Sequence, residues 1–337
     1  MQQITNQRIA YLDTMRVVAT FGVIALHVFC TDYHSTIGSY NWFVAVIVDT
    51  LVRWSVPLFV MISGALFLQP SKEVSYRTLL KKQIPRLFIA YVFWGIVYGL
   101  IMTARSKMSS CDFKLEAVIP HFHLWYIPML MGVYMLIPIL RKIASEEKMT
   151  RTVLGIWMVY LIGCFFDFDN IRQMGILFQA NSIVAYAGYF LFGYYVSSHE
   201  ITKKQAGWIY LVGISGAIIA VCGNIIPAYA KKIGVETYLN NLGPHVVAMS
   251  LALFTFIKQI MPKIERKIIG FVEYVRKDLF GIYLTHALWF MVINISPIRN
   301  LCNHLITLPL ITIAIFFLSL YTTKLLRAIP VLRKTVE

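Results

Sequence analysis

Charged side chains are scarce in this sequence. Asp, Glu, Lys and Arg make up 14% of the 337 residues, whereas they make up about a quarter of a soluble domain. Hydrophobic residues make up 58%, and the mean hydropathy is +0.67. The apolar residues form repeated runs near the roughly 20 residues that cross a bilayer. This pattern excludes an ordinary soluble domain and predicts an all-α, polytopic membrane protein that has the lipid bilayer as a partner.

Other missing features exclude further classes of function. The five cysteines form no CxxC pair, so we expect neither a zinc site nor a thioredoxin-like site, and no bound cofactor. The net charge is +15, but Lys and Arg are spread among short loops, without a dense basic tract, so nucleic acid is not an expected partner. No loop is long enough to fold separately, which predicts one membrane domain over residues 1–337.

The apolar runs predict ten transmembrane helices, at residues 10–30, 42–68, 85–103, 122–140, 152–166, 178–197, 207–226, 240–257, 279–296 and 305–323. The first has no small-residue cleavage site, so it is expected to be retained. With the N-terminus in the cytoplasm, 22 of the 31 Lys and Arg residues lie in cytoplasmic segments and 7 in outer loops. This asymmetry predicts that both termini are cytoplasmic.

The first span carries an acid, a base and an imidazole. At about 100° per residue, Asp13, Arg16 and His27 lie within an arc of about 60° and extend along about 21 Å of helix. Charges inside a bilayer are costly and are by default candidates for function. A structural alternative is an i,i+3 pair of Asp13 and Arg16 near the cytoplasmic end, with Arg16 reaching the interface. His27 lies deeper and is harder to explain in this way.

The second span carries Arg53 near the middle of the membrane, where an arginine stays charged and needs a partner. Asp49, one turn earlier, is the structural candidate for that partner. Pro57 is expected to kink the helix and free a carbonyl group. Ser63 and Gly64 are small enough to allow close helix packing.

Histidines also occur in the fourth and ninth spans. The segment HFHLWYIPML places His121, His123 and Trp125 at the outer end of the fourth span, where an interfacial aromatic belt is the structural explanation. The HxH spacing is a weak metal signal because no Cys or carboxylate accompanies it. His286 lies near the middle of the ninth span, one turn from Tyr283.

Four segments carry a resemblance, in the order YLDTMRVVATFGVIALH, RWSVPLFVMISGALF, HLWYI and GIYLTHAL. The sequence resembles the acyltransferase-3 integral membrane acyltransferases over nearly its whole length, especially the branch with bacterial surface-polysaccharide and enterobacterial-common-antigen O-acetyltransferases. The ten residues between Arg16 and His27 match the first-helix signature of that family. Some relatives carry a fused extracellular hydrolase-like domain, which leaves room for a partner protein here.

The resemblance implies transfer of an acyl group, usually acetyl, from cytoplasmic acetyl-CoA to a sugar hydroxyl of a lipid-linked or surface glycan. It also implies a location in the bacterial cytoplasmic membrane. We expect His27 to be the general base or a transient acyl carrier, with Arg16 and Arg53 binding phosphates or an oxyanion and Asp13 orienting Arg16. The remaining candidates for proton transfer or for substrate and donor binding are His123, His286, Trp125, Tyr283 and Ser63.

Two other classes of function are alternatives to an enzyme. An exporter of a glycan lipid or a small molecule would also explain charges inside the membrane, but the sequence has no paired broken helices in two matching halves. A membrane sensor or scaffold explains the topology but not Arg53 and His27.

Overall fold

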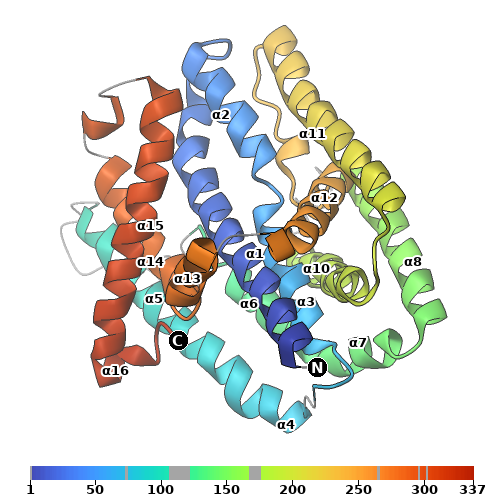
Figure 1. Cartoon of the computed structure of the whole chain (residues 1–337). Helices are drawn as coiled ribbons and strands as arrows, with labels where there is room; N and C mark the ends of the chain where they lie inside the picture. The colour runs from blue at the N-terminus through green and yellow to red at the C-terminus, as the bar shows by residue number, and fades with distance from the viewer. Residues whose placement is uncertain are drawn as a thin grey trace.

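The computed structural model describes residues 2–72, 75–105, 122–166, 176–263, 266–294, 297–300 and 303–337. Every regular element within these ranges is a helix, as the apolar runs predict. Figure 1 shows the helices as a bundle, with both termini at its lower end. We refer to that end as the termini end.

Within the described residues, seven helices have at least 17 residues, and most of them run through the bundle. They are α1 (Gln2–Phe29), α5 (Ile84–Arg105), α8 (Glu147–Phe166), α10 (Ile176–Ser198), α11 (Lys203–Lys231), α12 (Pro244–Ile260) and α15 (His304–Ala328). Helix α11 begins with a capping box in which Thr202 and Gln205 bond to each other's backbone N–H groups. That motif satisfies two N–H groups that the first helical turn leaves without partners.

Two predicted spans are broken helices. Helix α2 (Tyr40–Leu51) is separated by three residues from α3 (Ser55–Phe67), and α6 (Tyr126–Met135) meets α7 (Ile137–Ala144) at a bend of 57°. Each break is followed by a proline, Pro57 in α3 and Pro138 in α7. A proline lacks the N–H group that would continue the preceding helix.

Shorter elements complete the bundle. They are α4 (Tyr76–Thr78), α13 (Arg266–Val275), α14 (Leu279–Asn294), α16 (Pro330–Arg333), the π-helix η2 (Leu79–Gln83) and the 3-10 turns η1 (Cys30–His34), η4 (Thr237–Leu239), η5 (Met261–Lys263) and η6 (Pro297–Asn300).

Among the described residues, seven helical segments are long and apolar enough to cross a membrane, and the bent pair α6 and α7 makes an eighth. The two other predicted spans coincide with α10 and with the shorter apolar helix α14, although residues 295–296 of the latter lie outside the described residues. Ten spans and a cytoplasmic location of the termini stay predictions.

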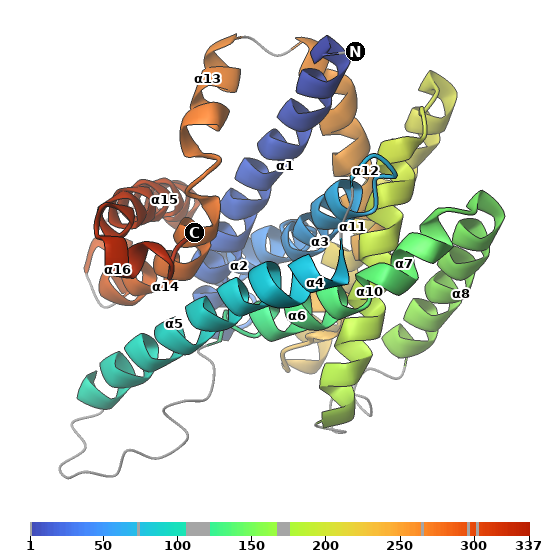
Figure 2. The ribbon, with the colours of Figure 1, turned by 90° about the horizontal axis from the view of Figure 1, so that it is seen from below.

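Helix α1 lies at the centre of this arrangement. Figures 1 and 2 show it between α13–α16 on one side and α2, α3 and α12 on the other. Its residues belong to two buried clusters, with Met15 and Ala19 in the larger and Ile24 and Val28 in the smaller. Helix α1 is therefore packed against protein on more than one side.

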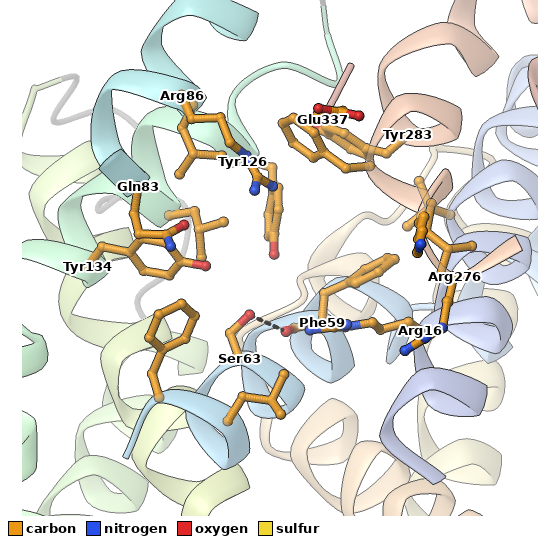
Figure 3. A pocket seen from close by; sticks show the side chains of 18 of the residues that line it. Arg16, Phe59, Ser63, Gln83, Arg86, Tyr126, Tyr134, Arg276, Tyr283 and Glu337 are labelled. Carbon is orange, nitrogen blue, oxygen red and sulfur yellow. Dashed lines mark hydrogen bonds between the residues drawn. The ribbon is translucent and has the colours of Figure 1, made fainter. Parts of the chain in front are cut away.

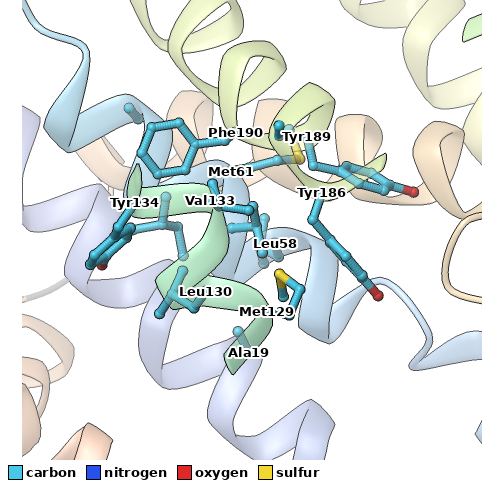
Figure 4. Packing of buried hydrophobic residues seen from close by; sticks show 14 of the residues in the cluster. Ala19, Leu58, Met61, Met129, Leu130, Val133, Tyr134, Tyr186, Tyr189 and Phe190 are labelled. Carbon is cyan, nitrogen blue, oxygen red and sulfur yellow. The ribbon is translucent and has the colours of Figure 1, made fainter. Parts of the chain in front are cut away.

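Two glycines bring α3 and α10 into direct backbone contact. A Cβ atom on Gly64 would lie 1.7 Å from the Phe190 carbonyl oxygen, and one on Gly193 would lie 2.0 Å from the Met61 carbonyl oxygen. Figure 4 shows Leu58, Met61 and Phe190 packed together at this crossing. Small residues at helix crossings allow this close approach inside membranes, as predicted for Gly64. The crossing fixes α3, whose other face carries Ser63.

Candidate active site

The first-span pair forms as its spacing predicts. The Arg16 guanidinium donates to Asp13 over 3.1 Å, and Arg276 approaches the other carboxylate oxygen of Asp13 at 3.6 Å. Asp13 is buried, whereas 34% of the Arg16 side chain is exposed. Asp13 therefore links α1 to the segment between α13 and α14. It binds one nitrogen of the Arg16 guanidinium, and the side chain of Arg16 is otherwise partly exposed.

Arg16 faces a cavity of about 620 Å³ near the termini end. Figure 3 shows Arg16 and Arg276 on one side of the cavity, Arg86 and Gln83 on another, and Tyr126 between them. Seven cationic side chains line it, namely Arg16, Lys72, Arg86, Arg276, Lys277, Arg327 and Arg333. Among the lining residues, one carboxylate side chain opposes them, that of Glu337, which bonds to Arg333 at 2.7 Å and to Arg327 at 3.3 Å.

One cation that lines the cavity, Lys72, has a lowered pKa. Burial lowers the pKa of the Lys72 ammonium, and the nearby charges of Arg16 and Arg141 lower it further. Lys72 also lies 4.3 Å from the centre of the Phe67 ring. An excess of cations this large, with one of them already destabilised by its neighbours, favours an anionic ligand.

The rest of the cavity wall is aromatic and apolar. Tyr126, Tyr134 and Tyr283 line it together with Phe59 and Ser63. The Ser63 hydroxyl donates to the Phe59 carbonyl at 3.0 Å, so its oxygen remains able to accept a further bond. The cavity thus combines a cationic part with an aromatic part that suits an uncharged portion of the same ligand.

Three histidines from distant parts of the chain meet beside this cavity. His27 lies in the last turn of α1, His123 precedes α6 and His286 lies within α14. The ring centre of His286 is 5.3 Å from that of His27, in a stacked arrangement, and 5.1 Å from that of His123. The structure therefore brings together three residues that the sequence placed in separate spans. His121 lies outside the described residues.

Tyr283 connects the cavity to the three histidines. Its side chain lines the cavity, and its hydroxyl donates to the backbone carbonyl of His123. Its own carbonyl oxygen lies 2.6 Å from Nδ1 of His286, and its ring centre lies 5.7 Å from that of His123. One residue therefore orients two histidines and contributes to the cavity wall.

The other candidates lie apart from the cavity. Arg53 bonds to Asp49 at 2.5 Å and is absent from the cavity wall. Trp125 packs against Tyr186 with ring centres 5.8 Å apart and against Tyr126 at 6.4 Å, so it supports the aromatic wall from behind.

Six of the seven cavity cations were not identified as site residues from the sequence. In the predicted topology these cations lie in cytoplasmic segments, and topology alone is sufficient to explain them there. They come from α5, α15, α16 and the loops beside α3 and α13, so only the folded chain shows that they share one cavity. Within the described residues, no group of three or more His, Cys, Asp or Glu side chains could hold a metal ion.

The fold and the site define the class of this protein: it is a helical membrane protein with a cationic cavity beside a cluster of histidines. The chain belongs to the acyltransferase-3 family, because the sequence model of its acyltransferase domain matches residues 9–326. That match spans nearly the whole chain and makes it a membrane acyltransferase by family. Comparisons with curated proteins and with solved structures found no match.

Proposed function

We propose that this protein transfers an acyl group, acetyl in the first instance, from cytoplasmic acyl-CoA to a hydroxyl group of a lipid-linked or cell-surface glycan. The observation that carries the proposal is the contact of Tyr283 with both the cationic cavity and the histidines. A donor in that cavity would present its reactive end to side chains that can move protons.

Coenzyme A fits the chemistry of the cavity. Its pyrophosphate and 3′-phosphate carry several negative charges, which arginine recognises by paired hydrogen bonds. Arg16, Arg86 and Arg276 surround the cavity and could take these groups. The uncharged pantetheine arm and thioester would then lie along Phe59, Tyr126 and Tyr283, toward the histidines.

His27 is the general base in this proposal. Its imidazole accepts the proton of the acceptor hydroxyl while the hydroxyl oxygen attacks the thioester carbonyl. The C–S bond then breaks, and the thiolate of CoA takes up the proton. His286, stacked on His27 at 5.3 Å, and His123 are placed to pass that proton or to orient the ring. Asp13 holds Arg16, and Ser63 provides an acceptor oxygen in the cavity.

The proposed location is the bacterial cytoplasmic membrane, with the cavity on the cytoplasmic side and the histidines nearer the outer leaflet. This placement separates a donor that is made inside the cell from a glycan that is displayed outside it. A partner protein could then act on the acylated product at the outer surface.

The proposal can be tested with purified protein in nanodiscs, radiolabelled acetyl-CoA and a membrane lipid extract as the acceptor. We expect label to appear in a glycolipid and CoA to be released by the wild type, with a loss of at least about 100-fold in His27→Ala. Retention of label on the wild-type protein and not on His27→Ala would instead identify His27 as an acyl carrier.

The matched control is His199→Ala, because His199 lies outside the cluster and contacts Glu147 at 3.7 Å. It should retain wild-type activity. An unchanged rate in folded His27→Ala, or a wild type that neither binds acyl-CoA nor releases CoA, would contradict the proposal.

A further inference from the structure

The break between α2 and α3 is an irregular backbone within an otherwise apolar span. Arg53 lies at its centre, and its carbonyl cannot accept the usual helical bond from residue 57, because that residue is a proline. Non-helical backbone at membrane depth is tolerated where it is buried in protein or faces water. In membrane transporters, helix breaks of this kind commonly form the polar binding site.

Asp49 and Arg53 form a buried ion pair at this break. Asp49 is 1% exposed and the Arg53 side chain 16% exposed. One carboxylate oxygen of Asp49 accepts from Arg53 at 2.5 Å, while its other oxygen, Oδ1, and Nε of Arg53 have no hydrogen-bond partner within the described part of the chain. Burying such groups without a hydrogen-bond partner is unfavourable, and buried polar atoms in folded proteins are nearly always bonded.

Asn224 of α11 joins Asp49 and Arg53 in a set of three polar residues at this break. Its amide nitrogen donates to the Thr50 hydroxyl at 3.0 Å, which holds it next to the turn of α2 that carries Asp49. Asn224 is 1% exposed, and its Oδ1 also lacks a hydrogen-bond partner among the described residues. Two buried acceptors and one buried donor therefore remain open around a single helix break.

The chemistry of this set differs from that of the cationic cavity. The charge of Arg53 is compensated by Asp49, so the pair does not favour an anion such as a phosphate. A ligand hydroxyl donates one hydrogen bond and can also accept one, so two neighbouring hydroxyl groups would satisfy both open acceptors and Nε of Arg53. The set therefore matches an uncharged polyhydroxylated ligand.

The set lies toward the end of α1 that carries His27. Both Asp49 and Arg53 act electrostatically on the Cys30 thiol, and that thiol donates to the His27 carbonyl at 3.3 Å. Glu236, an exposed residue before η4, acts electrostatically on Asp49, and η4 packs against α2. A ligand bound at Asp49 would lie on the His27 side of the bundle.

We propose that Asp49, Arg53 and Asn224 form a saccharide-binding site that holds the acceptor by its hydroxyl groups, separate from the acyl-CoA cavity. This inference rests on the proposed function, because a saccharide acceptor is needed only if the protein acylates one. It assigns Arg53 to acceptor binding rather than to the donor.

The test measures half-saturation for the two substrates separately, in nanodiscs, with acetyl-CoA and the membrane lipid extract. Asp49→Asn and Arg53→Lys should each raise the half-saturating extract concentration about tenfold, which is about 1.4 kcal/mol. Half-saturation by acetyl-CoA should not change. If the half-saturating concentration of the extract does not change, or if that of acetyl-CoA rises, the assignment is overturned.

A purely structural role of the ion pair is tested by two further variants. Combining Asp49→Asn with Arg53→Gln removes both charges, so neither side chain is left as an unpaired charge. If the ion pair is purely structural, the double variant should recover wild-type acceptor binding. If the pair binds the acceptor, binding should stay impaired. Arg299→Lys alters a different buried pair, in which Arg299 bonds to Asp32 at 2.9 Å, and should leave half-saturation by the extract unchanged.

Failure of this inference is distinguishable from failure of the proposed function. If the wild type transfers label to the extract and the variants at Asp49 and Arg53 match it, only the acceptor site is wrong. If the wild type neither releases CoA nor transfers label, the proposed function is wrong, and the acceptor site is overturned with it.

Discussion

Arg16 and Arg53 begin from similar sequence contexts and end in different surroundings. Each lies in an apolar span, and each pairs with an aspartate one turn earlier, Asp13 at 3.1 Å and Asp49 at 2.5 Å. The Arg16 side chain is 34% exposed and faces a cavity with six other cations, whereas the Arg53 side chain is 16% exposed and lies away from that cavity.

This comparison shows that an aspartate partner does not by itself determine what an arginine can bind. At Arg16 the seven cations of the cavity are paired, among the described residues, with only three carboxylates, those of Asp13, Asp278 and Glu337, so a positive excess remains that attracts an anion. At Arg53 the carboxylate balances the charge, and the remaining open hydrogen-bonding atoms determine the ligand. The two sites therefore suit the two substrates of a transfer reaction, an anionic donor and a neutral acceptor.

The largest expected difference between the two pairs is in stability. Asp49→Ala leaves Arg53 buried without its carboxylate, which should reduce the free energy of unfolding by about 3–5 kcal/mol. Asp13→Ala should reduce it by at most about 1 kcal/mol, because water can reach Arg16. Thermal unfolding in one detergent measures both, and equal losses would show that the surroundings of the two pairs do not differ as described.

The two ion pairs and the break in the second span could be predicted from the sequence, but the different surroundings of the two arginines could not. The i,i+3 and i,i+4 spacings predicted both ion pairs, because such residues are neighbours on a helix. Pro57 predicted a disturbed second span, and its break is found at residues 52–54. The role of Arg53 could not be predicted, because it depends on which residues of other helices surround it.

The histidines illustrate the same limit. The wheel of the first span predicted that His27 shares a face with Arg16, but contact with His123 and His286 depends on how α1, α6 and α14 pack. Spacing along one helix fixes a face, and tertiary packing determines what that face meets.

The second expected difference is in donor binding. Arg16→Ala should raise half-saturation by acetyl-CoA about tenfold or more, because a charge-assisted hydrogen bond to phosphate is lost. Arg53→Lys should leave that value unchanged. Steady-state CoA release over a range of acetyl-CoA concentrations gives both values, and a similar increase in both variants would refute the assignment of the two arginines to different substrates.

A third difference concerns salt. Seven cations line the cavity that we propose for the donor. Raising the ionic strength from low values to about 0.15 M, where screening acts over about 8 Å, should therefore weaken acetyl-CoA binding several-fold. Binding of an uncharged acceptor near Asp49 and Arg53 should change much less. The two half-saturation values can be followed in the same nanodiscs from low to moderate salt. A matching loss for both substrates would mean that the acceptor site is also governed by net charge.

The smallest expected effect comes from Lys72, one of seven cations. Its pKa is lowered by burial and then by Arg16 and Arg141, so the ammonium loses its charge at a lower pH than an ordinary lysine does. Binding of acetyl-CoA should therefore weaken, by about threefold, as the pH rises through that lowered pKa. Lys72→Arg keeps its charge throughout this range and should not show the decline. Parallel pH profiles of half-saturation in the two proteins would mean that Lys72 does not contact the donor, whereas a decline confined to the wild type would place one phosphate beside Lys72 and Arg16.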